Sequence, residues 1–368
     1  MGISGKKIWI DIEEPKTGIM FKSLIRMFKQ SNINLLITAR DYDSTFQIMD
    51  DLGVNYIKVG KHGGEKLEDK LKTYIDRLND LMPIVTEFNP NYFVTFSSVE
   101  GARLAYGLKI PSFGYNDEPR NEPVCKLILP LLDNILTPDC VPEDWYLKLG
   151  AIPKQLIRYN GIDEIAWLSE YTPNPKVLDK FDVEKGNYVI IRSEPSFASY
   201  FIETLKPEET LITQFLPSIC KNFPNQKYFV LVRTEKQEKY VKKNLKSALN
   251  ENIEITRYLS DIVDLCYYSS LIISGGGTIV RESSLLGAPS IEFFPGESAP
   301  QEKFLIDHGF PLEHIREPKA IAERAIEILS ASIDSQRFSL SFKEKIDQFE
   351  NPNKICYDFV TKQLNKIK

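Results

Sequence analysis

Short apolar runs alternate along the chain with longer segments in which apolar residues recur every three or four positions. Residues 8–12, 34–39 and 92–96 are such runs, whereas residues 18–30 and 99–108 have the spacing of amphipathic helices. A strand of a parallel sheet is apolar throughout, because helices cover both faces of the sheet. The alternation therefore predicts an α/β protein with doubly wound parallel sheets.

The same alternation continues to the end of the chain. Further strands are predicted at residues 56–59, 112–115, 134–137, 188–192, 227–232, 253–256, 271–274 and 290–294. Further helices are predicted at residues 44–52, 66–88 with an interruption at Pro83, 208–222, 236–249, 260–269, 278–286, 318–330 and 342–366. Ligands of such sheets bind at the carboxyl ends of the strands, so the loops there are the places to search for a site.

The alternation weakens over residues 151–175, which indicates a boundary between two halves. Pro173 and Pro175 lie close together there and interrupt regular structure. We predict one domain over residues 1–170 and a second over residues 176–345. Residues 346–368 are predicted to form a terminal helix able to pack back on the first domain.

The composition is that of an ordinary globular protein and narrows the function classes. The 368 residues are 42% hydrophobic and 26% charged, with a formal net charge of −5. A negative chain is a poor general binder of nucleic acid, whose phosphates require a basic surface. The sequence has no apolar run of about 18 residues and begins directly with the first strand, so we expect no membrane span, no signal peptide and a cytoplasmic location.

Cysteine and histidine residues are few and scattered. The three histidines lie far from the cysteines in sequence, and no Cys-x-x-Cys pair occurs. The five cysteines are Cys125, Cys140, Cys220, Cys266 and Cys356. This pattern favours neither a disulfide framework nor a zinc site.

A run of glycines between a predicted strand and a predicted helix is the most informative segment. Ser274 ends the strand, Gly275, Gly276 and Gly277 follow, and Thr278 opens the helix. Glycines let backbone N–H groups approach a ligand, and a helix N-terminus favours a phosphate. A ligand-free turn is the alternative interpretation. Glu282, one helical turn further on, is placed to accept hydrogen bonds from ribose hydroxyls.

The wider pattern Ser-Gly-Gly-x-x-x-x-Arg-Glu-Ser-x-x-x-Gly-x-Pro, from Ser274 to Pro289, resembles the nucleotide-binding segment of two protein groups. These are the GT-B glycosyltransferases and the UDP-N-acetylglucosamine 2-epimerases. The resemblance implies that Gly276 and Gly277 face a diphosphate and that Glu282 binds the ribose.

The first half of the chain adds a closer resemblance, to the domain-of-unknown-function 354 family, which extends from about residue 8 to about residue 315. The segments that carry it are residues 37–41, 59–63, 110–112, 116–117, 136–138 and 158–161. It implies a GT-B type α/β fold: two doubly wound parallel-sheet domains that face an interdomain cleft. The first would lie on the acceptor side, and the second would bind a nucleotide sugar.

Other loops supply further candidate residues. Thr17 and Gly18 follow the first strand, where the GT-B resemblance implies a loop near the sugar, although Glu13, Glu14 and Pro15 replace the usual Gly-Gly-His type of loop. An ordinary turn is the alternative.

Polar residues after four more predicted strands are candidates for catalysis and for donor binding. Asp117 is our first choice for a general base and Glu118 the second, with a solvated loop as the alternative. Arginines suit a diphosphate because they bind it in bidentate fashion. The GT-B resemblance implies that the loop of Arg192, Ser193 and Glu194 faces the donor phosphates. Arg233 and Glu297 are weaker candidates, and a surface ion pair is the alternative for either arginine.

Two further patterns have a functional and a structural interpretation. Asp41-Tyr42-Asp43 spells the D-x-D of some metal-dependent transferases, but we predict no metal site because paired carboxylates are common in loops. Lys16, Lys22, Arg26 and Lys29 line the first predicted helix. They could rest on an anionic membrane at its inner face, or they could be the solvated edge of a core helix.

The leading hypothesis is a metal-independent glycosyltransferase that moves a sugar from a nucleotide-sugar donor, taken to be a UDP-sugar, to an unidentified acceptor. The acceptor could be lipid-linked or a glycan. We expect no cofactor besides the nucleotide-sugar donor and no nucleic-acid partner. The oligomeric state is left open. One alternative is a nucleotide-sugar 2-epimerase or related hydrolase, which the absence of a histidine near Arg192 disfavours. A second is a non-catalytic GT-B-fold binding protein.

Overall fold

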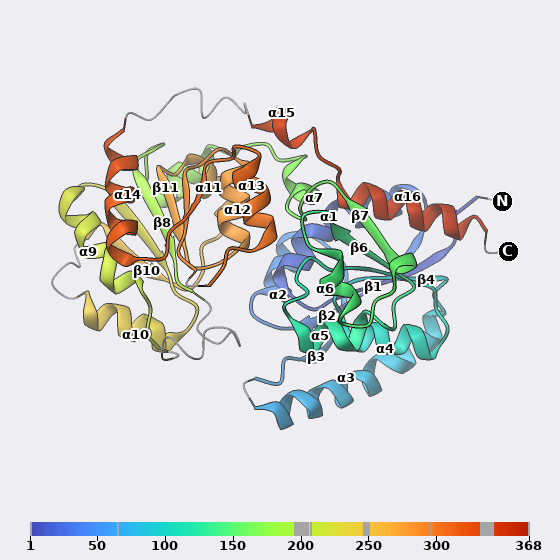
Figure 1. The fold of residues 1–368 in the computed structure, drawn as a ribbon. Coiled ribbons are helices and arrows are strands. Elements are labelled where there is room, and N and C mark those ends of the chain that lie inside the picture. Colours follow the sequence, from blue (N-terminus) through green and yellow to red (C-terminus); the bar gives the residue numbers. More distant parts are fainter. Residues whose placement is uncertain are drawn as a thin grey trace. The chain divides into compact units, whose positions relative to one another are not determined.

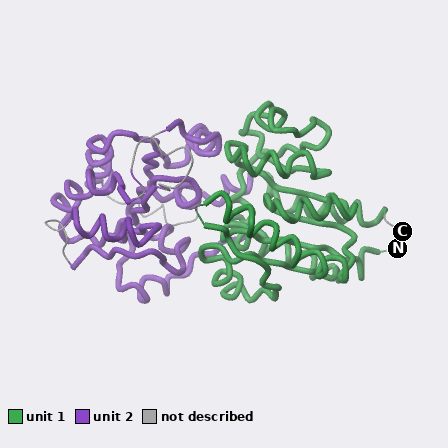
Figure 2. The backbone as a smooth tube through the Cα atoms, turned by 90° about the horizontal axis from the view of Figure 1, so that it is seen from below, with its two compact units in different colours: residues 1–169, 349–368 green, residues 170–348 purple. Residues whose placement is uncertain are grey.

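The computed structural model describes residues 2–64, 66–194, 206, 208–245, 251–294, 296–331 and 342–366. The chain divides into two compact units (Figure 2). Unit 1 comprises Met1–Ser169 and Phe349–Lys368, and unit 2 comprises Glu170–Gln348. Each unit is a sheet of parallel strands with helices packed on it (Figure 1).

In unit 1 a seven-stranded sheet has the order β3-β2-β1-β4-β5-β6-β7. The strands are β1 (Lys7–Ile12), β2 (Asn34–Asp41), β3 (Ile57–Lys61), β4 (Tyr92–Phe96), β5 (Ser112–Tyr115), β6 (Asn134–Pro138) and β7 (Leu156–Tyr159). The helices are α1 (Pro15–Gln30), α2 (Thr45–Asp51), α3 (Leu67–Phe88), α4 (Val99–Gly107), α5 (Glu122–Ile128), α6 (Glu143–Leu147), α7 (Ile165–Leu168) and α16 (Pro352–Leu364). The order reverses between β1 and β4, so the loops after these strands lie at the switch point of the sheet.

Two apolar cores form, one on each face of this sheet. Strand β1 contributes to both, because successive side chains point to opposite faces: Ile8 and Ile10 lie in one core, and Trp9 in the other. Helices α1 and α16 cover the first core, and α3, α4 and α5 cover the second. The two termini of the chain thus share one unit, with α16 beside α1 (Figure 1).

In unit 2 a six-stranded sheet has the order β10-β9-β8-β11-β12-β13. The strands are β8 (Tyr188–Arg192), β9 (Lys227–Leu231), β10 (Ile253–Thr256), β11 (Leu271–Ser274), β12 (Ser290–Glu292) and β13 (Leu312–His314). The helices are α8 (Lys176–Phe181), α9 (Ile212–Asn222), α10 (Glu235–Asn244), α11 (Ile262–Tyr268), α12 (Thr278–Leu285), α13 (Pro300–Asp307), α14 (Pro318–Ser330) and α15 (Lys343–Ile346). Here the order reverses between β8 and β11, which places the loops after those two strands side by side.

Several element predictions are wrong in detail. Pro83 does not interrupt α3: it lies on the exposed side of the helix, where water can satisfy the carbonyl group that a proline leaves without a donor. The single helix predicted at residues 342–366 is two helices, since Asn351 caps a new one by accepting from the Asn353 and Lys354 N–H groups. The helix predicted from residue 208 begins at Ile212. Of the helix predicted at residues 236–249, residues 246–249 lie outside the described residues.

Candidate functional site

The glycine loop of unit 2 joins the central strand β11 to helix α12. Ser274 Oγ accepts a hydrogen bond from Gly276 N at 3.3 Å and donates one to Gly276 O at 3.0 Å. Gly277 occupies the N-cap position of α12 and, having no side chain, leaves the first N–H groups of the helix without a side-chain cap. Backbone N–H groups and the positive end of the helix dipole therefore meet at this loop, a combination that suits a phosphate.

The loop after β8 lies directly against the glycine loop. Gly275 N donates to Arg192 O at 3.0 Å. A Cβ atom on Gly275 would lie 2.6 Å from Glu194 Cα, so only glycine fits this close approach. Two segments singled out from the sequence, residues 192–194 and 274–278, are thus neighbours at the carboxyl ends of adjacent strands.

Glu194 and Ser193 hold this loop in place through hydrogen bonds within unit 2. The Glu194 carboxylate accepts from Thr210 Oγ1 at 2.6 Å and from Leu211 N at 2.8 Å, just before α9. Ser193 Oγ donates to Gln237 Oε1 at 3.0 Å, and Arg233 Nε donates to Ser193 O at 3.1 Å. Both Ser193 and Glu194 are fully buried, so their observed contacts are structural.

Glu282 lies on α12 among buried residues and is 5% exposed. The charge of Glu282 acts on Cys266 of α11. Burial is the main cause that raises the pKa of the Cys266 thiol, Glu282 raises this pKa further, and Arg192 lowers it. Arg192 and Glu282 are therefore within electrostatic reach of the same thiol.

Sequence reasoning missed a buried ion pair beside the glycine loop. Arg281 Nη1 donates to Glu302 Oε1 at 2.9 Å, and a Cβ atom on Gly277 would lie 2.8 Å from that same nitrogen. Arg281 belongs to the Ser274–Pro289 pattern described above. Glu302 lies on α13, a helix that the apolar spacing did not predict. Glu297, the remaining candidate of unit 2, is exposed.

A lysine held between two aspartates is the main feature of the corresponding region of unit 1. Lys16 Nζ, at the start of α1, lies 2.7 Å from Asp117 Oδ2 and 2.9 Å from Asp163 Oδ2. The same nitrogen lies 4.5 Å from the centre of the Phe96 ring. We call Lys16, Asp117 and Asp163 the lysine triad. Asp117 follows β5 and Asp163 follows β7, so the sheet brings these side chains together.

Two carboxyl groups near Lys16, those of Asp163 and Glu14, have raised pKa values. Burial, and then the charge of Asp117, raises the pKa of Asp163 from 3.8 to about 7. Burial also raises the pKa of Glu14, which lies near Lys16 and Asp117, while Lys16 opposes that rise. Carboxyl groups with a pKa near neutrality can both give and take a proton, as acid–base chemistry requires.

The other candidates of unit 1 lie outside the triad. Glu118 forms a surface ion pair with Arg120 at 2.5 Å. Thr17 and Gly18 are buried in α1, where a Cβ atom on Gly18 would lie 3.0 Å from Met49 Sδ of α2. The contact of Gly18 is therefore a packing contact between two helices.

The first helix is a core helix. Its apolar residues Met20, Phe21 and Leu24 are fully buried. This supports the interpretation of its basic residues as the solvated edge of a core helix. Lys16 does not belong to that solvated edge, because both of its carboxylate partners are buried.

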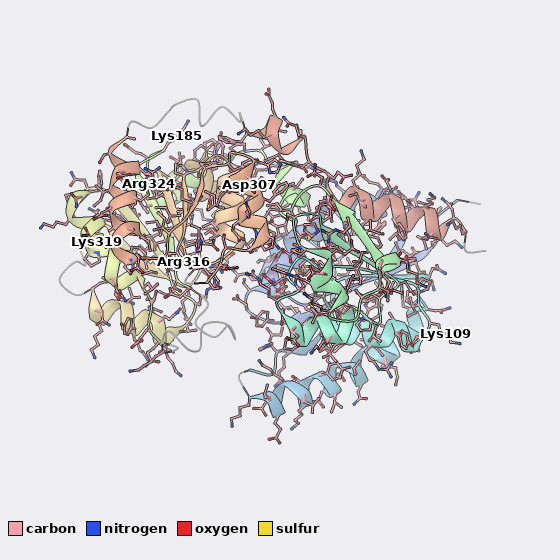
Figure 3. The ribbon with its side chains drawn as sticks, in the orientation of Figure 1. Lys109, Lys185, Asp307, Arg316, Lys319 and Arg324 are labelled. Carbon is pink, nitrogen blue, oxygen red and sulfur yellow. The ribbon has the colours of Figure 1, made fainter. Side chains whose placement is uncertain are left out.

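A network of buried charges surrounds the end of β1, just before the helix that carries Lys16. Most charged side chains extend outward, as Lys109, Lys185 and Lys319 do in Figure 3. Arg77 of α3 is instead fully buried and contacts Asp11 at 2.8 Å, Glu13 at 3.0 Å and Glu100 at 3.3 Å. Burial, and then Glu100, raise the pKa of Glu13 to about 7. The network fixes the end of β1, from which the loop to Lys16 departs.

Neither a metal cluster nor a membrane-spanning helix is found in the part of the chain that the structure describes. No group of three or more His, Cys, Asp or Glu side chains there could hold a metal ion, and this includes Asp41 and Asp43. No described helix is both long enough and apolar enough to cross a membrane.

Comparison with known proteins identifies the family. A sequence model described as "Protein of unknown function (DUF354)" matches residues 6–365. The chain belongs to the DUF354 family. A relative, an uncharacterised protein of Methanocaldococcus jannaschii, is 27% identical over 305 residues, which cover 82% of this chain and 85% of that protein. The resemblance predicted from the first half of the sequence is confirmed.

Solved structures with the same fold include proteins bound to uridine nucleotides. One is UDP-GlcNAc 2-epimerase from Neisseria meningitidis bound to UDP-GlcNAc, with TM-score 0.70, 14% identity, and coverage of 97% of this chain and 100% of that one. Another is Anabaena HepE in complex with UDP and glucose, with TM-score 0.64, 12% identity, and coverage of 98% and 100%. These similarities confirm the predicted α/β fold of GT-B type for this DUF354 protein.

Proposed function

We propose that this DUF354 protein is an enzyme that uses a nucleotide sugar, taken to be a UDP-sugar, and transfers its sugar to an acceptor hydroxyl. The observation that carries the proposal is the glycine loop: Gly275, Gly276 and Gly277 open helix α12 at the switch point of a doubly wound sheet. Such a loop suits a diphosphate. The neighbours bound to UDP support uridine as the base.

In this proposal unit 2 binds the donor. The N–H groups at the start of α12 and the Arg192 guanidinium stabilise the negative charge of the diphosphate, which grows as the diphosphate leaves. The Glu282 carboxylate accepts hydrogen bonds from the ribose hydroxyls.

Unit 1 supplies the general base. The acceptor oxygen forms a bond to the anomeric carbon while its proton moves to the Asp117 carboxylate, and the bond from that carbon to the diphosphate oxygen breaks. Lys16 Nζ lies 2.7 Å from Asp117 Oδ2 and holds this carboxylate in place before the transfer. Glu118 is a weaker candidate because Arg120 pairs with it at the surface.

A second candidate function is epimerisation at the sugar C2. It is favoured by the number of carboxyl groups, since Glu14, Asp117 and Asp163 all lie near Lys16. Epimerisation needs acid–base groups on both sides of one carbon, whereas transfer to a hydroxyl needs one base.

Incubation with UDP-sugars in D₂O, followed by proton and phosphorus NMR, separates the two functions. A transferase releases UDP only when an acceptor is added and leaves the C2 proton in place. Loss of the C2 proton signal without an acceptor would instead establish epimerisation. No change in any UDP-sugar, with a panel of sugar and lipid-linked acceptors and a folded protein, would contradict both. Asp117→Asn should abolish the reaction, and Asp139→Asn, a change at an exposed aspartate, should not.

A further inference from the structure

The second aspartate on Lys16 has no task in the reaction proposed above. Asp163 is 2% exposed, yet it is fully engaged: Oδ2 contacts Lys16 Nζ at 2.9 Å, and Oδ1 accepts a hydrogen bond from Tyr159 OH at 2.7 Å. A buried carboxylate costs several kcal/mol in desolvation, so one that shares a cation with a second carboxylate calls for an explanation.

We propose that Asp163 is a positioning residue, which holds Lys16 against Asp117 and balances the charge of the triad when Asp117 takes up the acceptor proton. The inference rests on the proposed function, because it assigns Asp163 to the proton transfer of that same site. The geometry is what carries it: one ammonium group bridges two carboxylates that come from different loops.

The charges of the triad explain the expected effect. When all three groups are ionised, the triad has a net charge of −1 in a buried place. Proton uptake by Asp117 removes one negative charge and brings the triad to a net charge of zero. An ionised Asp163 therefore favours proton transfer to Asp117, whereas with a protonated Asp163 the same transfer would leave the triad with a net charge of +1.

The groups that face Asp163 come from several elements. Lys16 lies on α1, Asp117 follows β5, Tyr159 ends β7, and Glu164 is the next residue along the chain. Asp163 also contributes to raising the pKa values of the buried Tyr115 and Tyr146 above their usual range, although burial is the larger cause for both. Of these neighbours, Lys16 is the cation that contacts Asp163 directly.

The pH dependence of kcat, measured with the donor and acceptor that the wild-type protein turns over, tests the role of Asp163. Since the pKa of Asp163 is about 7, we expect the wild-type kcat to rise about tenfold between pH 6 and pH 8. Asp163→Asn should remove this rise and lower kcat at pH 8 about tenfold or more. Tyr159→Phe removes the hydrogen bond to Oδ1, so it should keep the rise but move it to higher pH. The control Asp139→Asn should leave the profile unchanged.

A second measurement, the unfolding free energy against pH, does not require activity. The folded protein holds the Asp163 proton to about pH 7, whereas the unfolded chain releases it near the usual 3.8. This proton therefore stabilises the fold below about pH 4, and its contribution is lost as pH rises through 7. Asp163→Asn should lose this part of the pH dependence.

The outcomes separate the inference from the function on which it rests. Turnover by the wild type with an unchanged kcat rise in Asp163→Asn would overturn the role of Asp163 and leave the proposed function standing. No turnover by the wild type, with the stability difference present, would overturn the proposed function and with it this role. If Asp163→Asn does not fold, Tyr159→Phe decides: a profile identical to that of the wild type would overturn the inference.

Discussion

Gly275 is the residue on which the shape of the glycine loop most directly depends. A Cβ atom there would lie 2.6 Å from Glu194 Cα and 2.7 Å from Glu194 N. Both are backbone atoms, which cannot rotate away as the end of a long side chain can. Any larger residue must therefore displace the loop after β8, whose place is fixed by the hydrogen bonds from Thr210 and Leu211 to Glu194.

Gly275→Ala should lower the free energy of unfolding by about 1–3 kcal/mol, the usual cost of forcing an extra methyl group into a packed site. It should also weaken the stabilisation of the protein by UDP, because the backbone N–H groups move. Urea unfolding with and without UDP measures both effects. Gly2→Ala is the control, since the nearest atom to its Cβ would be 3.9 Å away. Unchanged stability and UDP response would contradict the close approach.

At this scale the sequence predicts residue types better than residue pairs. The glycines and Asp117 stand out because they closely follow strands, and Glu282 stands out because it lies one helical turn beyond the glycines. The pairing of Lys16 with Asp163 could not be predicted, because 147 positions separate the two residues and no local pattern marks Asp163. Only the order of strands in the sheet brings these two loops together.

The element that organises unit 1 around its site is α3, through Arg77. The guanidinium contacts Asp11, Glu13 and Glu100, and Nε donates to Val59 O at 3.0 Å. It thereby links α3 to the ends of β1 and β3 and to the start of α4. Removal of one member of a buried ion network is costly, because the remaining charges stay buried without compensation.

Arg77→Met should therefore destabilise unit 1 by about 3–5 kcal/mol. The methionine fills much of the space of the arginine stem, so the loss reports on charge more than on packing. Chemical denaturation measures it, with Arg103→Met on the exposed side of α4 as the matched control. Equal unfolding free energies of the two variants would contradict a stabilising role of the Arg77 network.

Edge strands account for much of what the apolar pattern missed. Strands β7 and β13 stand at the ends of their sheets, and most of their residues are only partly buried. An edge strand needs fewer apolar residues than a central one, so Arg158 and Glu313 can occur within such strands. The central strands are buried on both faces and are therefore apolar throughout, so the apolar pattern predicted their bounds within one or two residues.

At the scale of the whole molecule, the far end of the chain completes the first unit. Cys356, Val360 and Leu364 of α16 are fully buried in the core that α1 also covers. Asn353 Nδ2 donates to Met20 O at 2.6 Å and to Ser23 Oγ at 2.7 Å. Unit 1 therefore depends on a helix that is far along the chain from its seven strands.

Removal of residues 349–368 should unfold unit 1 and leave unit 2 folded, because each unit has its own core. Hydrogen exchange read by mass spectrometry should show lost protection in β1 to β7 and retained protection in β8 to β13. A variant with Lys362→Ala, a change on the same helix with its buried face intact, should keep both. Full protection of unit 1 in the shortened chain would contradict this dependence.

The measurement that tests the central claim most directly is calorimetric titration of the whole protein with UDP, UDP-sugars, GDP and ADP. We predict that uridine diphosphate binds, and that Glu282→Ala weakens binding at least tenfold, since a hydrogen bond to a charged group contributes about 1.5–3 kcal/mol. Ser284→Ala, a buried change on the same helix, should bind as the wild type does. If no nucleoside diphosphate binds the folded protein, or if Glu282→Ala binds UDP as well as the wild type, the assignment of the glycine loop and Glu282 to a nucleotide sugar is contradicted.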